Sequence, residues 1–414
     1  MTVILVFFYI SSGFFWILLL YHCVLALAGI YERLTPSRYP IPERYPSVAL
    51  LIPAYNESLV LADTLEAMRK LRYPGKLDIY VLNDGSTDHT AEIARFYAEQ
   101  VPFIHCIDVP PGQPKGKARV LNYGISVTDS DYVAVFDADN RPAPDCLMKL
   151  VHAAVSTPKA VGAVGHVRTL NESRNFFTRC IALEFSTFQL LMQAGRWRLF
   201  RLGSLPGTVM VVRRDALIAA GGYDPNALAE DADLSISLNK RGGQLVVVPE
   251  AVSWEEEPET FSVWFRQRTR WMEGNFYLIA KSLRHAREFR GRAAIDAVQL
   301  LSIYILGVLM MTYSNICFLL GLTGLFAAPS NLPLLLFWFD SWFILFLQLL
   351  SAQMLDKPRF RAVDLAVALA MYFTYAQLWY LVLLRGAWRY QKRKRKPIVW
   401  DKTQRFGKGL DVSA

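Results

Sequence analysis

Long apolar blocks stand at both ends of the chain. The first, residues 3–30, contains no Asp, Glu, Lys or Arg and exceeds the roughly 20 residues that a helix needs to cross a bilayer. Because it lacks the basic start and the shorter apolar core of a cleaved signal peptide, the pattern favours a permanent anchor. Three further apolar blocks follow at 294–328, 332–355 and 362–384. The pattern therefore predicts a multi-pass membrane protein.

Between these blocks, short β-rich runs alternate with helical patterns, after a Pro-rich and charged linker at 31–47. Strands are predicted at 47–53, 77–83, 103–109 and 131–137. Helices are predicted at 59–71, 89–100 and 117–127. This alternation predicts an α/β domain with a mostly parallel sheet covered on both faces, in which ligands bind at the carboxyl ends of the strands.

Composition and charge agree with a membrane protein. The chain is 53% hydrophobic with a net charge of +9, and its densest basic run, 389–396, directly follows an apolar block. Such a run either binds anionic lipid head groups or holds a helix end in the cytosol, so we expect no nucleic-acid partner. The five cysteines show no paired metal spacing and no even disulfide count, which favours a reduced, cytosolic domain.

Acidic and polar residues follow the predicted strands. "AYNES" (54–58), "DGSTD" (84–88) and "DADN" (137–140) each come after a strand. Taken singly, "DGSTD" reads as a turn and a helix cap, and two acids after a strand can also be a cap. Two carboxylates spaced as in "DAD" can instead hold a divalent cation that bridges phosphate oxygens.

Five motifs in order carry a resemblance to a known family: "PAYNE" (53–57), "NDGSTD" (83–88), "DAD" (137–139), "AED" (229–231) and "QRTRW" (267–271). The chain resembles the family 2 glycosyltransferases, specifically the membrane-embedded cellulose, hyaluronan and poly-N-acetylglucosamine synthases. The last group is the most similar in size, in its late membrane blocks and in a tail like "WDKTQR" (400–405).

This resemblance implies three regions. An anchor and linker would occupy 1–44, a cytosolic, GT-A-like domain with a mixed, mostly parallel sheet would occupy 45–292, and three membrane segments with a basic tail would occupy 293–414. The protein would then lie in the cell membrane, in contact with membrane lipids and open to a small membrane partner subunit.

The resemblance also implies a donor site for a UDP-sugar. Asp84 would read the uracil, and Pro53, Tyr55 and Glu57 would line the nucleotide cleft. Lys117 would lie near the nucleotide, Asp137 would contact it, and Asp139 would hold Mg²⁺ or Mn²⁺ on the diphosphate. Asn83 stands where the family usually has Asp, so its role is open.

Catalytic roles follow from the later motifs. Asp231 would be the base with Glu230 beside it, and Asp233 would face elsewhere; a plain charge cluster at a helix start is the alternative. Gln267, Arg270 and Trp271 would hold the departing UDP and the acceptor. The reaction also requires these residue types independently of the resemblance. Inverting transfer needs one base, and it needs positive charges that offset a leaving diphosphate.

Three expectations concern neighbouring segments. The amphipathic run 260–290 reads as a helix lying on the bilayer, with Trp271 at the membrane surface; an ordinary surface helix is the alternative. Segment 207–217 either approaches the acceptor or is a core strand followed by a helix. Block 362–384 has basic residues on both flanks, so either it is re-entrant or the tail is outside, and we favour a cytosolic tail.

The leading hypothesis is an inverting, processive synthase that uses UDP-N-acetylglucosamine to extend a β-linked polysaccharide at the membrane. One alternative is a transferase that adds a single sugar to a lipid. Another, from a different class, is a non-catalytic membrane scaffold or transport component, which the intact acidic and QRTRW motifs disfavour.

Overall fold

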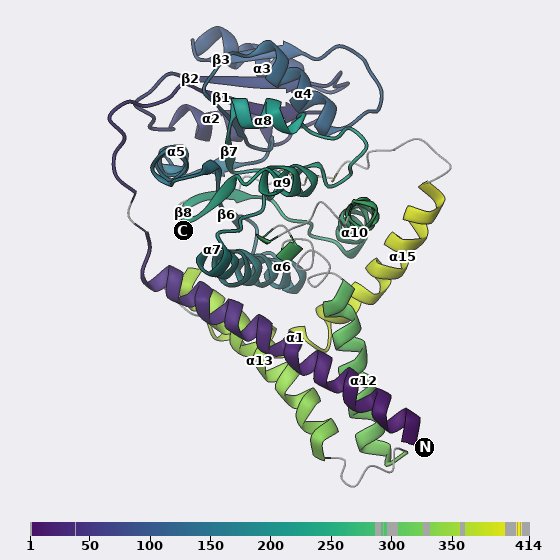
Figure 1. The fold of residues 1–414 in the computed structure, drawn as a ribbon. Coiled ribbons are helices and arrows are strands. Elements are labelled where there is room, and N and C mark those ends of the chain that lie inside the picture. Colours follow the sequence, from purple (N-terminus) through teal and green to yellow (C-terminus); the bar gives the residue numbers. More distant parts are fainter. Residues whose placement is uncertain are drawn as a thin grey trace.

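The computed structural model describes residues 2–37, 39–285, 291–292, 294–295, 305–325, 332–356, 361–393, 403, 405 and 407. Figure 1 shows an α/β domain at the top of the view and a group of long helices that extends below it.

An eight-stranded sheet lies at the centre of the α/β domain. The strands are β1 (Val48–Ala54), β2 (Leu77–Asn83), β3 (Ile104–Asp108), β4 (Tyr132–Val135), β5 (Arg141–Pro142), β6 (Ala160–Thr169), β7 (Met210–Arg213) and β8 (Gln244–Glu255). Their order is β3-β2-β1-β4-β7-β6-β8-β5. The pairs within β3-β2-β1-β4 and the pair β6–β8 are parallel, whereas β7 and β5 run antiparallel to their neighbours. The sheet is therefore mixed and mostly parallel, which confirms the expected fold.

The sequence pattern explains the parallel half of the sheet. Strand β1 presents Leu50, Leu51 and Ile52 with no exposed surface, as expected for a strand whose two faces are both covered by helices. The predicted helices are present as α2 (Leu61–Arg69), α3 (Thr90–Gln100) and α4 (Lys117–Val127). Helices α5 (Cys146–Ser156), α8 (Arg214–Ala220) and α9 (Glu230–Lys240) complete this part of the domain (Figure 1). Segment 207–217 is a core strand followed by a helix, β7 and α8.

A helical layer separates the sheet from the long helices. It contains α6 (Phe176–Ser186), the π-helix η1 (Thr187–Gln193), α7 (Ala194–Phe200) and α10 (Phe261–Arg284). Helix α6 starts at a capping box, in which Asn175 Oδ1 accepts from the Thr178 amide at 2.9 Å and Thr178 Oγ1 accepts from the Asn175 amide at 3.1 Å. π-Helical turns are rare and recur at functional sites.

The long helices are α1 (Thr2–Leu34), α12 (Gly307–Thr323), α13 (Leu332–Asp356), α14 (Ala362–Met371) and α15 (Leu378–Arg393), with a 3₁₀ turn, η4 (Tyr375–Gln377), between the last two. Within the part of the chain that the structure describes, three segments are long and apolar enough to be candidate membrane spans: Phe8–Leu34, Leu334–Asp356 and Ala362–Lys392. Helix α1 runs beside α13 (Figure 1).

Two glycines let α1 lie directly on the helical layer. A Cβ at Gly29 of α1 would overlap the backbone of Leu191 in η1, and a Cβ at Gly195 of α7 would overlap the backbone of Leu25 in α1. Leu25 and Leu191 are themselves fully buried. Helix α1 therefore packs on the α/β domain with backbone against backbone at these two glycines.

The third candidate span begins and ends at the α/β domain. At its start, Arg179 Nη1 of α6 pairs with Asp364 Oδ1 at 2.9 Å; near its end, Arg389 Nε pairs with Glu273 Oε2 of α10 at 2.9 Å. The chain turns between these points at η4, where Asn315 of α12 donates to Gln377 Oε1 at 3.3 Å. The segment is long and apolar enough to be a candidate span, and both of its ends contact the α/β domain.

Helix α10 is packed against α15, and Gly386 of α15 touches Met272 of α10. The location of α10 at a bilayer surface stays a prediction. Exposed large apolar side chains of α10 are confined to its ends, Phe261 and Leu283. The amphipathic pattern of 260–285 is consistent with burial between the domain and α15. Residues 286–290 lie outside the described part of the chain.

Candidate active site

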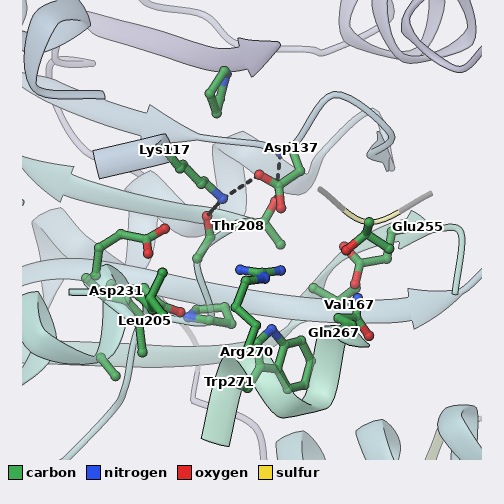
Figure 2. A pocket seen from close by; sticks show the side chains of 18 of the residues that line it. Lys117, Asp137, Val167, Leu205, Thr208, Asp231, Glu255, Gln267, Arg270 and Trp271 are labelled. Carbon is green, nitrogen blue, oxygen red and sulfur yellow. Dashed lines mark hydrogen bonds and ion pairs between the residues drawn. The ribbon is translucent and has the colours of Figure 1, made fainter. Parts of the chain in front are cut away.

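A cavity of about 380 Å³ lies where β1, β2 and β4 end. Its walls come from those strand ends, from the start of α9, from α10 and from the α6–η1 layer. Every predicted site residue except Asp139 lines it: Pro53, Tyr55, Glu57, Asp84, Lys117, Asp137, Glu230, Asp231, Gln267, Arg270 and Trp271. Figure 2 shows Lys117, Asp137, Asp231 and Arg270 facing one another across this space.

The predicted nucleotide side of the cavity is built on two adjacent strand ends. The backbone amide of Asp84 donates to the Ala54 carbonyl at 2.9 Å, which holds the end of β2 beside the end of β1. Asn83, whose role was open, is structural: its amide group donates to Asp108 Oδ1 at 2.7 Å and its Oδ1 accepts from the Ser86 amide at 3.1 Å. The "NDG" turn thus places the Asp84 carboxylate at the cavity wall.

Lys117 lies at the centre of the acidic side chains. Its ammonium group contacts Asp137 Oδ1 and donates to the Gly207 carbonyl at 2.8 Å. The backbone amide of Asp137 donates to Thr208 Oγ1 at 3.0 Å. Figure 2 shows Lys117 and Asp137 joined in this way, with Thr208 next to them. The positive charge of Lys117 is therefore held in place next to the acidic side chains of the cavity.

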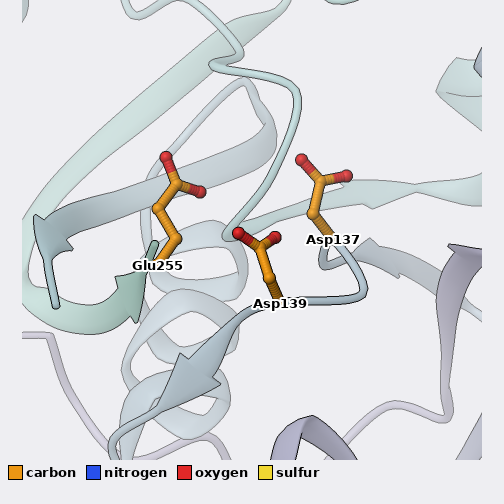
Figure 3. Close-up of side chains that lie close together, drawn as sticks. All are labelled: Asp137, Asp139 and Glu255. Carbon is orange, nitrogen blue, oxygen red and sulfur yellow. The ribbon is translucent and has the colours of Figure 1, made fainter. Parts of the chain in front are cut away.

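Asp137 and Asp139 meet a third carboxylate, that of Glu255, which the sequence did not indicate. One oxygen of each residue lies within 4.8 Å of the others, as Figure 3 shows. Burial is the main cause that raises the pKa values of Asp139 and Glu255, and the charge of Glu257 adds to it at Glu255. Among the described residues, Asp139 Oδ1 is buried without a hydrogen-bond partner. A carboxylate group of this kind fits a divalent cation.

Arg405 of the tail reaches the same carboxylates. Its Nη1 lies 2.7 Å from Asp139 Oδ2, its Nε lies 3.9 Å from Glu57 Oε2, and Nη1 donates to the Glu256 carbonyl at 3.1 Å. From the sequence, "WDKTQR" was predicted only to be part of a cytosolic tail with a loose resemblance to the family. The structure brings its last residue into the acidic group.

Glu230 and Asp231 form a buried carboxylate pair at the start of α9. The helix is anchored by Ser235, whose hydroxyl donates to the Asp231 carbonyl at 2.8 Å and accepts from the Leu205 amide at 2.8 Å. Burial, together with the charge of Asp231, raises the pKa of Glu230 to about 7. Burial also raises the pKa of Asp231, whereas Lys117 opposes the rise. A carboxylate with a raised pKa is suited to accept a proton near neutral pH.

Asp233 has a different position from its two neighbours in the sequence. Its Oδ1 pairs with Lys281 Nζ at 2.7 Å, and it does not line the cavity. The three acids at the head of α9 are thus divided into a pair that faces the cavity and one that binds α10 to α9.

Trp271 is held by the residues around it. The guanidinium carbon of Arg268 lies 4.0 Å from the centre of its ring, and the ring of Phe185 is stacked against it at 6.2 Å. Arg268 is fully buried and also donates to Gln267 Oε1 at 2.8 Å and to Glu184 at 3.2 Å. Figure 2 shows Gln267, Arg270 and Trp271 approaching the cavity from one helix.

Fold and site together define the protein as a glycosyltransferase of the GT-A type. Residues 46–274 match the model described as "Glycosyltransferase like family 2". The chain is 34% identical over 409 residues to "Probable glycosyltransferase YdaM" of Bacillus subtilis (strain 168), covering 96% of this chain and 97% of that protein. The chain therefore belongs to glycosyltransferase family 2, which favours an enzyme over a scaffold.

Two further similarities are more distant. "Poly-beta-1,6-N-acetyl-D-glucosamine synthase" of Staphylococcus aureus (strain COL) is 28% identical over 234 residues, or 56% of each chain. The solved "Mannosyltransferase PcManGT from Pyrobaculum calidifontis in complex with GDP-Man and Mn2+" has a TM-score of 0.55 at 18% identity, covering 93% of this chain and 99% of that one. The latter shows a shared fold.

Proposed function

We propose that the protein is an inverting, processive glycosyltransferase of the membrane. It transfers a sugar from a UDP-sugar, with UDP-N-acetylglucosamine as the favoured donor, to a growing β-linked polysaccharide. One observation carries the proposal: a carboxylate pair, a fixed lysine and an aromatic clamp meet around one cavity, in a domain that packs directly on apolar helices. The match to a poly-N-acetylglucosamine synthase supports the choice of donor.

The chemistry divides among residues already described. Asp231 takes the proton from an acceptor hydroxyl, whose oxygen forms a bond with the anomeric carbon of the donor. The bond between that carbon and the diphosphate oxygen breaks, and UDP leaves with the electron pair. Lys117 and Arg270 offset the charge of the departing diphosphate, while Trp271 offers its ring to the acceptor sugar.

Asp137, Asp139 and Glu255 are proposed to hold Mg²⁺ or Mn²⁺. A bound cation would neutralise charge on the diphosphate of the donor. Asp139 is the principal ligand in this proposal because its buried carboxylate has an oxygen free of hydrogen bonds among the described residues.

The membrane has a direct place in this proposal. The domain at 45–292 works in the cytosol between the anchor, 1–44, and the membrane region, 293–414, and contacts lipids and a small membrane partner subunit. The contacts of Asp364 and Arg389 with the domain support a tail on the catalytic side. The polymer is extended next to the helices that would carry it across the bilayer.

The test is a donor panel. Purified full-length protein is offered several UDP-sugars with Mg²⁺ or Mn²⁺, and both UDP release and product length are measured, with Asp231→Asn as the inactive control. We expect UDP release that depends on the donor sugar and a ladder of products. No release with any UDP-sugar in a folded protein would contradict the proposal.

Transfer of a single sugar to a lipid is the second candidate, and one contact favours it. Phe188 lines the cavity and packs against the cluster of Leu25 and Ala352 on α1 and α13. The acceptor wall is thus backed by apolar helices that a lipid chain could follow. A single glycolipid product in the same panel, with no longer species, would identify this activity.

A further inference from the structure

Arg119 holds one side of the Asp84 carboxylate. The guanidinium group contacts Asp84 Oδ1, and its Nη1 donates to the Pro110 carbonyl at 2.6 Å. The side chains of Arg119 and Asp84 are only 16% and 15% exposed, so this pair is built into the wall. Among the described residues, the second oxygen of Asp84, Oδ2, has no hydrogen-bond partner.

Three separate elements fix this pair. Asp84 follows β2 and is held by Ala54 of β1, Arg119 belongs to the first turn of α4, and Pro110 follows β3. Burial raises the pKa of Asp84, and the charge of Arg119 acts against that rise. Arg119 therefore both supports the ionised carboxylate and fixes which of its oxygens faces the cavity. Arg119 does not itself line the cavity.

Nucleobases differ in what they offer to such a group. Uracil presents one N–H between two carbonyl oxygens, so one carboxylate oxygen is sufficient to read it. Guanine presents two adjacent N–H groups, which match both oxygens of a free carboxylate. With Oδ1 engaged by a guanidinium, the amino group of guanine would have to compete with Arg119 and lie beside its positive charge.

We infer that Arg119 is a positioning residue that makes the donor site select uracil over guanine. It acts through Asp84 by leaving a single acceptor oxygen for the base. The inference rests on the proposed use of a UDP-sugar. The choice is not made by the fold, since the mannosyltransferase of the same fold was solved with GDP-Man.

A simple structural clamp is the competing explanation, and it makes a different prediction. Loss of a clamp would weaken the binding of every nucleotide by the same factor. Loss of a selective arrangement changes the ratio of affinities, because a freed Oδ1 can accept the second N–H of guanine. The ratio of the dissociation constants for GDP and UDP therefore separates the two explanations.

The experiment measures binding of UDP and GDP by calorimetry to the full-length protein in detergent, with Mn²⁺ present. We expect the wild type to prefer UDP, and Arg119→Ala to lower that preference about 10-fold or more, since reading a base edge is worth roughly 1–3 kcal/mol. Arg119→Lys, which keeps a charged donor beside Oδ1, should retain most of the preference.

Arg95→Ala is the matched control. Arg95 also pairs with an aspartate, Asp108 at 2.7 Å, but both side chains are more than half exposed, and neither lines the cavity. This variant should keep the wild-type ratio. An unchanged ratio in folded Arg119→Ala, or in Arg119→Met if the alanine variant does not fold, would overturn the inference, as would equal binding of UDP and GDP by the wild type.

Failure of the proposed function gives a different result. A protein that prefers UDP in calorimetry but transfers no sugar would contradict the proposed activity and leave base selection intact. A protein that transfers sugar from UDP-sugars while Arg119→Ala keeps the full preference for UDP would do the reverse.

Discussion

Lys117 offers a sharp test because it is proposed to offset charge on the donor diphosphate and because its charge lowers the pKa of the proposed base. Its ammonium group contacts Asp137 Oδ1 and lies 2.8 Å from the Gly207 carbonyl, and its charge lowers the pKa values of Glu230 and Asp231. Lys117→Met keeps an unbranched side chain without the charge. Loss of one hydrogen-bonded charge costs about 1.5–3 kcal/mol, so kcat/KM should fall about 10- to 150-fold.

The pH dependence gives a second readout with a definite sign. The base must be unprotonated, so kcat rises with pH through its pKa and is level above it. Without the lysine that pKa is higher, and the rise moves to higher pH. Lys117→Arg keeps the positive charge, so its rise should stay at the wild-type position.

The assay is UDP release at saturating donor from about pH 5 to about pH 9, with Lys117→Arg as the variant that keeps the charge. We expect the Lys117→Met profile to move to higher pH and the Lys117→Arg profile to stay in place. A Lys117→Met profile that coincides with the wild type, or that moves to lower pH, would refute Asp231 as the base.

Other residues lead to four shorter predictions. Asp139→Asn should abolish turnover and Mn²⁺ binding in calorimetry while the protein remains folded and membrane-bound; full turnover of the wild type in excess chelator would contradict the metal site. Asp231→Asn should reduce transfer about 10²- to 10⁴-fold with UDP affinity nearly unchanged, whereas a large loss of UDP affinity would move this residue to the nucleotide site. Trp271→Ala should shorten the products on a gel more than it slows UDP release, and unaltered product length would remove the ring from acceptor binding. Gly195→Val should lower the thermal unfolding midpoint in detergent, because overpacking costs roughly 1–3 kcal/mol; an unchanged midpoint would show that α1 is not packed this closely.

The parallel half of the sheet was readable from the sequence because its strands are buried on both faces. β2 (Leu77–Asn83) and α4 (Lys117–Val127) have the predicted bounds. The fourth strand ends early, at Val135, because the chain turns where the Asp137 amide meets Asn140 Oδ1 and Thr208 Oγ1. The local sequence pattern is sufficient to predict that a strand is present. Where the strand ends depends on contacts with side chains that are distant in the sequence.

The residues missed in the site share one cause. Glu255 stands in an acidic run, "EEEPE" (255–259), where no spacing rule relates it to Asp139; only the pairing of β8 with β6 and β5 brings it there. Arg405 reaches the site through tertiary folding alone. The sequence alone could not separate two environments for helix α10, because burial under α15 and burial in a bilayer produce the same apolar stripe.

The contact at Gly29 and Gly195 also determines which segments can be exchanged between relatives in a chimera. An anchor that is joined to its enzyme only by a flexible linker can be replaced by another anchor. Here the anchor and the π-helix layer are fitted to each other's backbones, and the cavity wall belongs to that same layer. A chimera that takes α1 from a relative should therefore work only if it also takes residues 187–200, so that the anchor and the acceptor wall are inherited as one unit.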